Sequence, residues 1–248
     1  MTTTKEKTAS EISITDLLRA GAHFGHKRSR SHPKMGVYVY TTRDSIQILD
    51  LNKTLKKLNE ALSFVSKVAK RGGIILFVGT KRQAKNIVKE GALSCKMPYV
   101  TERWLGGTLT NFETIKKSIS KLEELEGKKM SKAWKEYTKK ERLLVEREIK
   151  KLNQNLEGIR KMDKLPDAVF IVGASSDKTA IREANRKEIP IIALADTDCD
   201  PTNIDYLIPA NDDAVKIIKM IVKLVAEKIK ESKGLPEEKK KIKKEDEK

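Results

Sequence analysis

The chain has 248 residues, of which 38% are hydrophobic, and 52 Lys and Arg against 35 Asp and Glu give it a net charge of +17. This length and composition suffice for one domain with a hydrophobic core plus an appendage, or for two small domains. The excess of positive charge predicts a polyanionic partner, with nucleic acid ahead of an anionic membrane surface. Its two cysteines, Cys95 and Cys199, lie too far apart for a disulfide framework or a zinc ribbon.

Two features argue against a membrane partner. The most apolar segment, Ile217 to Ala226, is interrupted by Lys219 and Lys223. It is also much shorter than the roughly 20 residues of a membrane span. Residues 1–11 are polar, contain no apolar signal region and are expected to form a flexible N-terminus. We therefore expect a cytoplasmic protein that binds no membrane.

The segment after a first short helix, which should end at Gly21, is strongly basic. No carboxylate occurs from Leu17 to Arg43. Solvated faces normally mix both signs of charge, so charge of one sign favours an irregular basic loop over 19–43 that lies on phosphates. The candidate phosphate ligands in this loop are Lys27, Arg28, Arg30, Lys34 and Arg43.

His23-x-x-His26, in the same loop, has a spacing that metals can use. Zinc would need a third and a fourth ligand, and neither Cys nor an acidic residue lies nearby in the sequence. We therefore predict no metal site here. A Ser-His-Asp arrangement is left open, although no G-x-S-x-G motif supports one.

Short apolar runs then alternate with helical patterns, which predicts an α/β body whose first part covers residues 12–107. The expected strands are Val37–Tyr40, Ile46–Leu49, Ile74–Val78 and Pro98–Val100. A first long helix should begin near Asn52 and end at Gly72-Gly73. The run from Ile74 is continuously apolar, as a buried parallel strand requires.

Gly79-Thr80-Lys81-Arg82 places a glycine and a helix N-terminus directly after that strand, which can form an anion site. Neither a P-loop nor a G-x-G-x-x-G motif is present, so a nucleotide cofactor is the weaker interpretation. Lys81 and Arg82 could equally hold an RNA phosphate, and both are candidate RNA ligands.

The decapeptide from Arg103 to Phe112 marks the point where the pattern of the sequence changes. Gly106-Gly107 permits a sharp turn, and the polar residues behind it can cap a helix. Arg103 beside Trp104 is a pair found at protein and nucleic-acid interfaces, although Trp104 could instead fill the joint between two parts of the protein. Arg103 is thus a candidate RNA ligand and Trp104 a candidate protein-docking residue.

Residues 108–162 are helical in pattern and densely charged. Apolar residues recur three and four apart from Phe112 to Leu122 and from Val145 to Ile159, which is the seam of a coiled coil. A polar tip between the two runs predicts an antiparallel helical hairpin that serves as a docking arm. Trp134 and Tyr137, near its bend, are candidate protein contacts.

The body resumes over 163–231. Further strands are expected at Ala168–Val172, Pro190–Leu194 and Tyr206–Ile208, with a helix at Asp177–Lys187 and a closing helix behind Asn211-Asp212-Asp213. Residues 232–248 are almost wholly Lys and Glu, so they are expected to be a disordered charged tail.

Asp196, Asp198 and Asp200 make the best case for an enzyme. Carboxylates behind a buried strand are typical of α/β ligand sites, and alternate acids suggest a magnesium-dependent phosphohydrolase. In such enzymes the motif follows the first strand of the domain, whereas here it comes near the end. Turn chemistry beside Pro201 is the favoured alternative. We predict no catalytic residue, and whether these carboxylates hold an ion stays open.

Several motifs together resemble one family. They are Ala22-His23-Phe24-Gly25-His26, Pro33-Lys34-Met35, Phe77-Val78-Gly79-Thr80-Lys81, Arg103 to Asn111, Leu165-Pro166-Asp167-Ala168 and Asp198-Cys199-Asp200-Pro201. In this order they resemble the S-two family of small-subunit ribosomal proteins over about residues 10 to 230. The hairpin is similar to that of the bacterial form.

The resemblance implies a flavodoxin-like parallel sheet with helices on both faces, interrupted by the coiled-coil hairpin, and no catalysis. It implies a structural role in the small ribosomal subunit, in assembly and translation. The implied partners are 16S-type ribosomal RNA, ribosomal protein S-one, which the family helps to anchor, and other small-subunit proteins. No cofactor is implied beyond magnesium associated with the RNA, and no small-molecule substrate.

Overall fold

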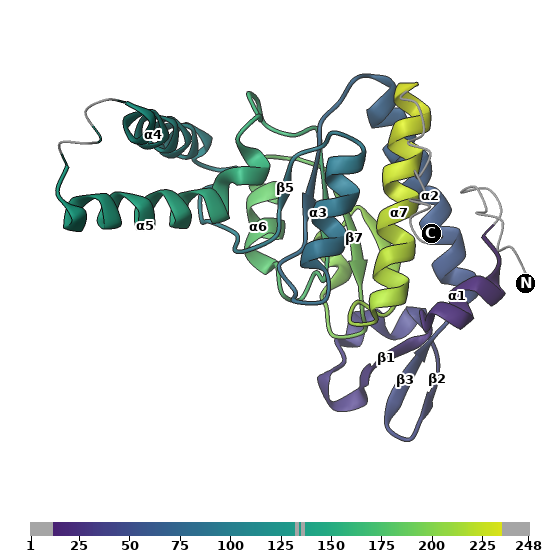
Figure 1. Cartoon of the computed structure of the whole chain (residues 1–248). Helices are drawn as coiled ribbons and strands as arrows, with labels where there is room; N and C mark the ends of the chain where they lie inside the picture. The colour runs from purple at the N-terminus through teal and green to yellow at the C-terminus, as the bar shows by residue number, and fades with distance from the viewer. Residues whose placement is uncertain (1–11, 132–133, 135–136, 235–248) are drawn as a thin grey trace, which may run out of the picture.

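The computed structural model describes residues 12–131, 134 and 137–234, and its centre is a five-stranded parallel sheet in the order β5-β4-β6-β7-β8 (Figure 1). The strands are β4 Ile75–Val78, β5 Tyr99–Val100, β6 Ala168–Val172, β7 Ile191–Ala195 and β8 Tyr206–Pro209. Numbered within this sheet alone, the order is the 2-1-3-4-5 arrangement of flavodoxin-like folds. The predicted α/β class with a parallel sheet is therefore confirmed.

Helices cover both faces of the sheet, as the fully buried strands β4, β6 and β7 require. They are α1 Ile14–Ala20, α2 Leu51–Lys70, α3 Lys85–Ser94, α6 Lys178–Arg186 and α7 Val215–Lys233. Phe77 and Phe170, whose ring centroids lie 5.2 Å apart, belong to a core shared with α1, α2, α3 and α7. Leu76 and Val169, their neighbours in sequence, belong to the core on the other face, with α6.

A second, antiparallel sheet lies at the bottom of Figure 1, in the order β1-β3-β2. Its strands are β1 Phe24–Lys27, β2 Val39–Arg43 and β3 Ile46–Leu49, and we call residues 24–49 the arm. The prediction of an irregular loop over 19–43 is wrong in this part, because β3 pairs along both edges and so satisfies the backbone groups of β1 and β2. Two short 3₁₀ helices span Arg28–Arg30 and Pro33–Tyr38. The strand expected to begin at Val37 is β2, which therefore begins two residues later, at Val39.

Two helices, α4 Phe112–Met130 and α5 Lys139–Leu156, extend from the body on the left of Figure 1, and we call them the projection. Ion pairs of Lys121 with Glu148 and of Lys129 with Glu146 show that they run antiparallel. The apolar side chains of α4 from Phe112 to Leu125 are buried, whereas Met130 at its end is exposed. Coiled-coil packing between the two helices stays a prediction.

Most of the other predicted elements occur near their expected places. The strands at Ile46–Leu49 and Ala168–Val172 have the predicted bounds. The helix that was expected to begin at Gly79-Thr80 starts later, at Lys85, because residues 81–84 form a turn first. The closing helix continues through Lys233 with Gly234 as its cap, whereas the predicted flexible N-terminus and residues 235–248 of the predicted tail lie outside the described residues.

Candidate nucleic-acid interface

The arm carries five of the predicted phosphate ligands, and all five residues are exposed: Lys27, Arg28, Arg30, Lys34 and Arg43. Lys34 donates a hydrogen bond to the Thr202 hydroxyl at 2.5 Å, and Arg43 lies 3.8 Å from the exposed Asp44 carboxylate. Lys27 is the last residue of β1, and Arg28 and Arg30 lie in the 3₁₀ helix that follows it. None of the three forms an ion pair with any described residue. These three cations are therefore available to an external anion.

The arm is attached to the sheet at the carboxyl end of β7. The His26 backbone N–H donates to the Thr197 hydroxyl at 3.0 Å, and the His32 N–H donates to the Thr197 carbonyl at 2.8 Å. Gly25 permits this approach, because a Cβ there would lie 2.8 Å from the Thr197 methyl carbon and 3.0 Å from the Gln47 carbonyl oxygen. The cations of the arm are thus presented on a backbone held to the body.

The predicted RNA ligand Lys81 points inward instead. Its Nζ donates to Asp212 at 2.6 Å and to Asp213 at 2.8 Å, and its side chain is only 12% exposed. On the other side of these acids, His26 Nδ1 lies 2.7 Å from Asp196 Oδ2, and its Nε2 lies 3.4 Å from Asp213. We call His26, Lys81, Asp196, Asp212 and Asp213 the charged cluster.

Electrostatics within the charged cluster shift several pKa values. Burial raises the pKa of Asp212 to about 6, although the Lys81 ammonium opposes the shift. Burial alone would lower the pKa values of Lys81 and His26, but the neighbouring carboxylates raise both. Gly173, with φ of +91°, gives the Lys81 stem its space, since a Cβ there would lie 2.9 Å from Lys81 Cδ.

The corner before the projection is organised by a residue that sequence reasoning missed. Trp104 is 8% exposed, and its indole N–H donates to Glu183 of α6 at 3.0 Å. The same carboxylate accepts the backbone N–H groups of Gly107, Leu109 and Thr110 at 2.8 to 3.1 Å. Trp104 therefore fills the joint and offers little surface to a neighbouring protein. The sequence feature that could have indicated this role is Glu183 itself, a glutamate on the otherwise apolar face of α6.

Arg82 and Arg103, the remaining predicted RNA ligands, are both exposed. Arg103 borders a hollow of about 320 Å³ beside the carboxyl ends of β4 and β6, the switch point of the sheet. Its lining residues are Thr80, Glu102, Arg103, Trp104, Ser176, Asp177 and Thr179. Two carboxylates in that lining would repel a nucleotide phosphate, and the Thr80 hydroxyl already donates to Asp177 at 2.9 Å. The hollow gives no support to a nucleotide cofactor.

The three aspartates behind β7 separate in space. Asp200 is exposed and accepts the Thr202 N–H at 3.0 Å, which is the turn chemistry that the sequence favoured. Asp196 points to His26 instead. Among the described residues, the group with metal-ligand spacing consists of His26, Asp196 and Asp212.

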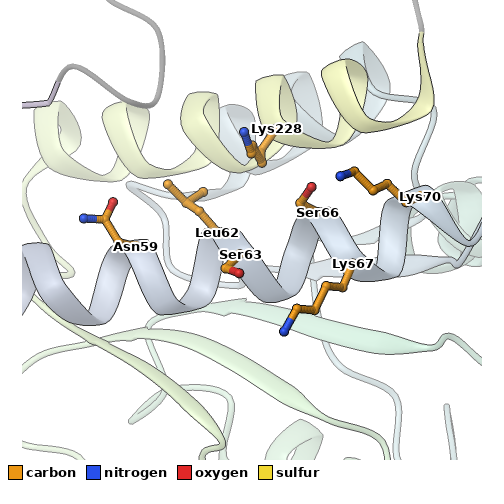
Figure 2. Close-up of a pocket in the computed structure, with 7 residues that line it drawn as sticks. All are labelled: Asn59, Leu62, Ser63, Ser66, Lys67, Lys70 and Lys228. Carbon is orange, nitrogen blue, oxygen red and sulfur yellow. The ribbon is translucent and has the colours of Figure 1, made fainter.

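A second basic surface lies between α2 and α7 and was not foreseen (Figure 2). It is a hollow of about 410 Å³ lined by Asn59, Leu62, Ser63, Ser66, Lys67, Lys70 and Lys228. Lys67 and Lys70 lie in the last turn of α2, where cations offset the negative end of the helix dipole. Stabilisation of the end of α2 is enough to explain the positions of Lys67 and Lys70, and no ligand is needed.

Trp134 and Tyr137, the predicted docking residues of the projection, are close together. Their ring centroids lie 5.6 Å apart in the connection between α4 and α5. Met130, Leu143 and Leu144 of the two helices are exposed apolar side chains. The far end of the projection therefore combines aromatic rings with exposed aliphatic groups.

Comparisons with known proteins identify the family to which the sequence is similar. The family model "Ribosomal protein S2" matches residues 17–232. The small ribosomal subunit protein uS2 of Thermus thermophilus, in each of two strains, is 46% identical over 224 residues, which are 90% of this chain and 88% of the relative. No helix in the described part of the chain is long and apolar enough to span a membrane. The family match and the identity to these relatives show that the chain belongs to the ribosomal protein S2 family, of bacterial type, and is a structural protein of the cytoplasmic small ribosomal subunit rather than an enzyme.

Proposed function

We propose that the arm binds phosphates of 16S-type ribosomal RNA and so anchors this protein in the small subunit. The observation that carries the proposal is the run of exposed cations, Lys27, Arg28 and Arg30, without an ion pair to any described residue. Because hydrogen bonds to Thr197 hold the arm to the sheet, little backbone freedom is lost when RNA binds. Lys34, Arg43, Arg82 and Arg103 extend the same interface, and Lys81 supports it from inside.

Recognition on this interface is mainly of RNA shape. The deep major groove of A-form RNA hides base edges, so side chains reach phosphates and 2′-hydroxyls first. Magnesium ions take part as ions bound to the RNA rather than as a cofactor for catalysis.

The projection is the proposed contact for neighbouring proteins, including ribosomal protein S-one. The proposal is that α4 and α5 pack as a coiled-coil hairpin that presents Trp134 and Tyr137, together with exposed Leu143 and Leu144. Trp and Tyr are enriched among the few residues that supply most of the binding energy of protein interfaces. Trp104 contributes by fixing the corner from which the projection leaves.

The test is the salt dependence of RNA binding. Replacing Lys27, Arg28 and Arg30 together by alanine should weaken binding of the protein to 16S ribosomal RNA and reduce the slope of log K against log salt by roughly two. The control is the triple alanine variant of Lys67, Lys70 and Lys228, which removes the same charge from the surface between α2 and α7. An arm variant with the wild-type slope, or a control with an equal loss, would contradict the proposal.

A further inference from the structure

The three-stranded sheet of the arm has one face that is open to solvent. In its central strand, β3, Gln47 and Leu49 are buried, whereas Ile46 and Ile48 are partly exposed. Successive side chains of a strand point to opposite faces of the sheet, so Ile46 and Ile48 mark the open face. In Figure 1 the arm extends away from the five-stranded sheet, with the turn between β2 and β3 at its end.

Strand pairing places cations and an aromatic ring on this open face, because residues directly opposite each other in an antiparallel pair share a face. One row across the three strands has a cation on each side of an aliphatic residue, and the next has an aromatic ring and a hydroxyl on the two sides of another. The residues of the two rows, which we call the outer face, are Lys27, Ile46 and Arg43, and Phe24, Ile48 and Thr41. The four residues that come from β1 and β2 are exposed.

A second exposed ring, that of Tyr40, precedes Thr41 on the edge strand β2. From Val39 to Thr41 the strand advances two residues, while its partner β3 advances one, from Leu49 to Ile48. Tyr40 is therefore the extra residue of a β-bulge, a feature that re-aims a side chain and is common beside functional sites. Its side chain is 77% exposed, and that of Phe24 is 48% exposed.

The ring of Phe24 is held in place before any ligand arrives. The His23 ring lies against it, with the two centroids 4.0 Å apart. Because the ring is already supported on one side, little side-chain freedom is lost on binding. Two rings this exposed on one small sheet indicate a surface for a partner.

The charge of the outer face indicates which partner. Lys27 forms no ion pair with a described residue, and Arg43 lies 3.8 Å from Asp44, whose side chain is 90% exposed, so this second pair is weak. Cations beside aromatic rings suit an unpaired RNA strand, since phosphates pair with the cations and every base offers a flat face to a ring. Membership of a ribosomal protein family makes ribosomal RNA the source of that strand.

We propose that the outer face binds unpaired nucleotides of ribosomal RNA, whose bases stack on Phe24 and Tyr40 while Lys27 and Arg43 contact their phosphates. The inference rests on the proposed function of the arm and deepens it, because it names single-stranded RNA as the form that this face binds. Stacking tolerates every base, so preference among the four bases is weak.

The first experiment compares two single-stranded probes on the full wild-type chain, by fluorescence anisotropy. One is an oligoadenylate of about eight nucleotides, and the other is an abasic chain of equal length that keeps the phosphates. The oligoadenylate should bind at least about fivefold more tightly, because only it can stack. Equal affinities would overturn the proposal, since phosphates alone would then account for binding. No variant has to fold for this comparison.

Variants identify the rings that stack. Phe24→Ala and Tyr40→Ala should each weaken oligoadenylate binding by at least about fivefold and leave binding of the abasic chain unchanged. Tyr40→Phe keeps the ring and should bind as the wild type does. Val37→Ala is the matched control, because it removes a 64% exposed aliphatic side chain from the same arm. Wild-type affinity in both ring variants would overturn the proposal and assign the rings to a protein partner.

The salt dependence separates this inference from the proposed function. Phe24→Ala and Tyr40→Ala remove no charge, so the slope of log K against log salt should stay at the wild-type value. A reduced slope in the triple alanine variant of Lys27, Arg28 and Arg30, together with wild-type affinity in both ring variants, would overturn the stacking alone. A triple variant with the wild-type slope would contradict the proposed function and, with it, the phosphate contact of Lys27.

Ultraviolet cross-linking of intact small subunits identifies the source of the stacked bases. The peptide that carries Phe24 or Tyr40 should be joined to an unpaired nucleotide of 16S ribosomal RNA. An adduct with messenger RNA alone would overturn the assignment to ribosomal RNA.

Discussion

Two buried carboxylates, Glu183 at the corner and Asp212 in the charged cluster, have opposite surroundings. Glu183 accepts five hydrogen bonds, from Trp104, Gly107, Leu109 and twice from Thr110. Asp212 accepts from Lys81 through one oxygen, and the other has no hydrogen-bond partner among the residues that the structure describes. Burial alone would raise both pKa values, but the donors around Glu183 hold its pKa below the usual range, whereas that of Asp212 rises to about 6.

The difference shows how one fold uses the same chemical group in two ways. The corner is complete in itself, so the base of the projection needs no further partner to be rigid. In the charged cluster one lysine ammonium, that of Lys81, faces the carboxylates of Asp212 and Asp213, so the buried charge near the attachment of the arm is only partly compensated. We therefore expect that only mutation destabilises the corner, whereas the stability of the attachment of the arm depends on the solution conditions.

The largest effect should come from Glu183→Ala. The substitution removes the acceptor of three N–H groups, one buried at Leu109 and two partly buried at Gly107 and Thr110, and a buried group without an acceptor costs about 1 to 3 kcal/mol. After partial relaxation we expect the free energy of unfolding to fall by about 3 to 5 kcal/mol, measured by urea denaturation. Exposed Glu90→Gln is the control, and a loss below about 1 kcal/mol in Glu183→Ala would contradict the assigned role of the corner.

Acid should remove part of the stabilisation that the Glu183 carboxylate gives to the folded protein. Because the pKa of folded Glu183 is lowered, its stabilising effect is present above the unfolded value of about 4.3 and disappears as the pH falls through the folded pKa. The difference in unfolding free energy between wild type and Glu183→Gln should therefore be constant near neutral pH and shrink below about pH 4. Urea denaturation at a series of pH values measures it. A difference that stays constant into acid would show that the charge of Glu183 is unimportant.

These two carboxylates also show how far the sequence could predict the molecule. Local patterns found the strands, because runs such as Ala168–Val172 are apolar whichever partners they meet. They could not find the bonds from Glu183 to the corner, 73 to 79 residues away, or the approach of His26 to Asp196, 170 residues away. The pairing of the arm was missed for the same reason, since β1 is ordered by β3 rather than by its own pattern. Lys81 was assigned to RNA because its sequence neighbours do not reveal Asp212.

Asp212→Asn should have a much smaller effect than Glu183→Ala. The variant loses an attraction to Lys81 but also loses repulsion from Asp196 and Asp213, and these terms oppose each other. We expect a change within about 1 kcal/mol of wild type in the free energy of unfolding. Urea denaturation of the variant and the wild type measures this change. A loss as large as that of Glu183→Ala would contradict the opposing contributions assigned to Asp212.

The smallest effect should come from the surface of the projection, where charges are solvated rather than buried. Lys121 and Glu148 form an ion pair although their side chains are 58% and 42% exposed. Water already stabilises both groups, so Lys121→Ala should lower the free energy of unfolding by only about 0.2 to 1 kcal/mol, and less at high salt. Urea denaturation at low and high salt measures this. A loss as large as that of Glu183→Ala would mean that contacts between α4 and α5, rather than the buried corner, hold the projection in place.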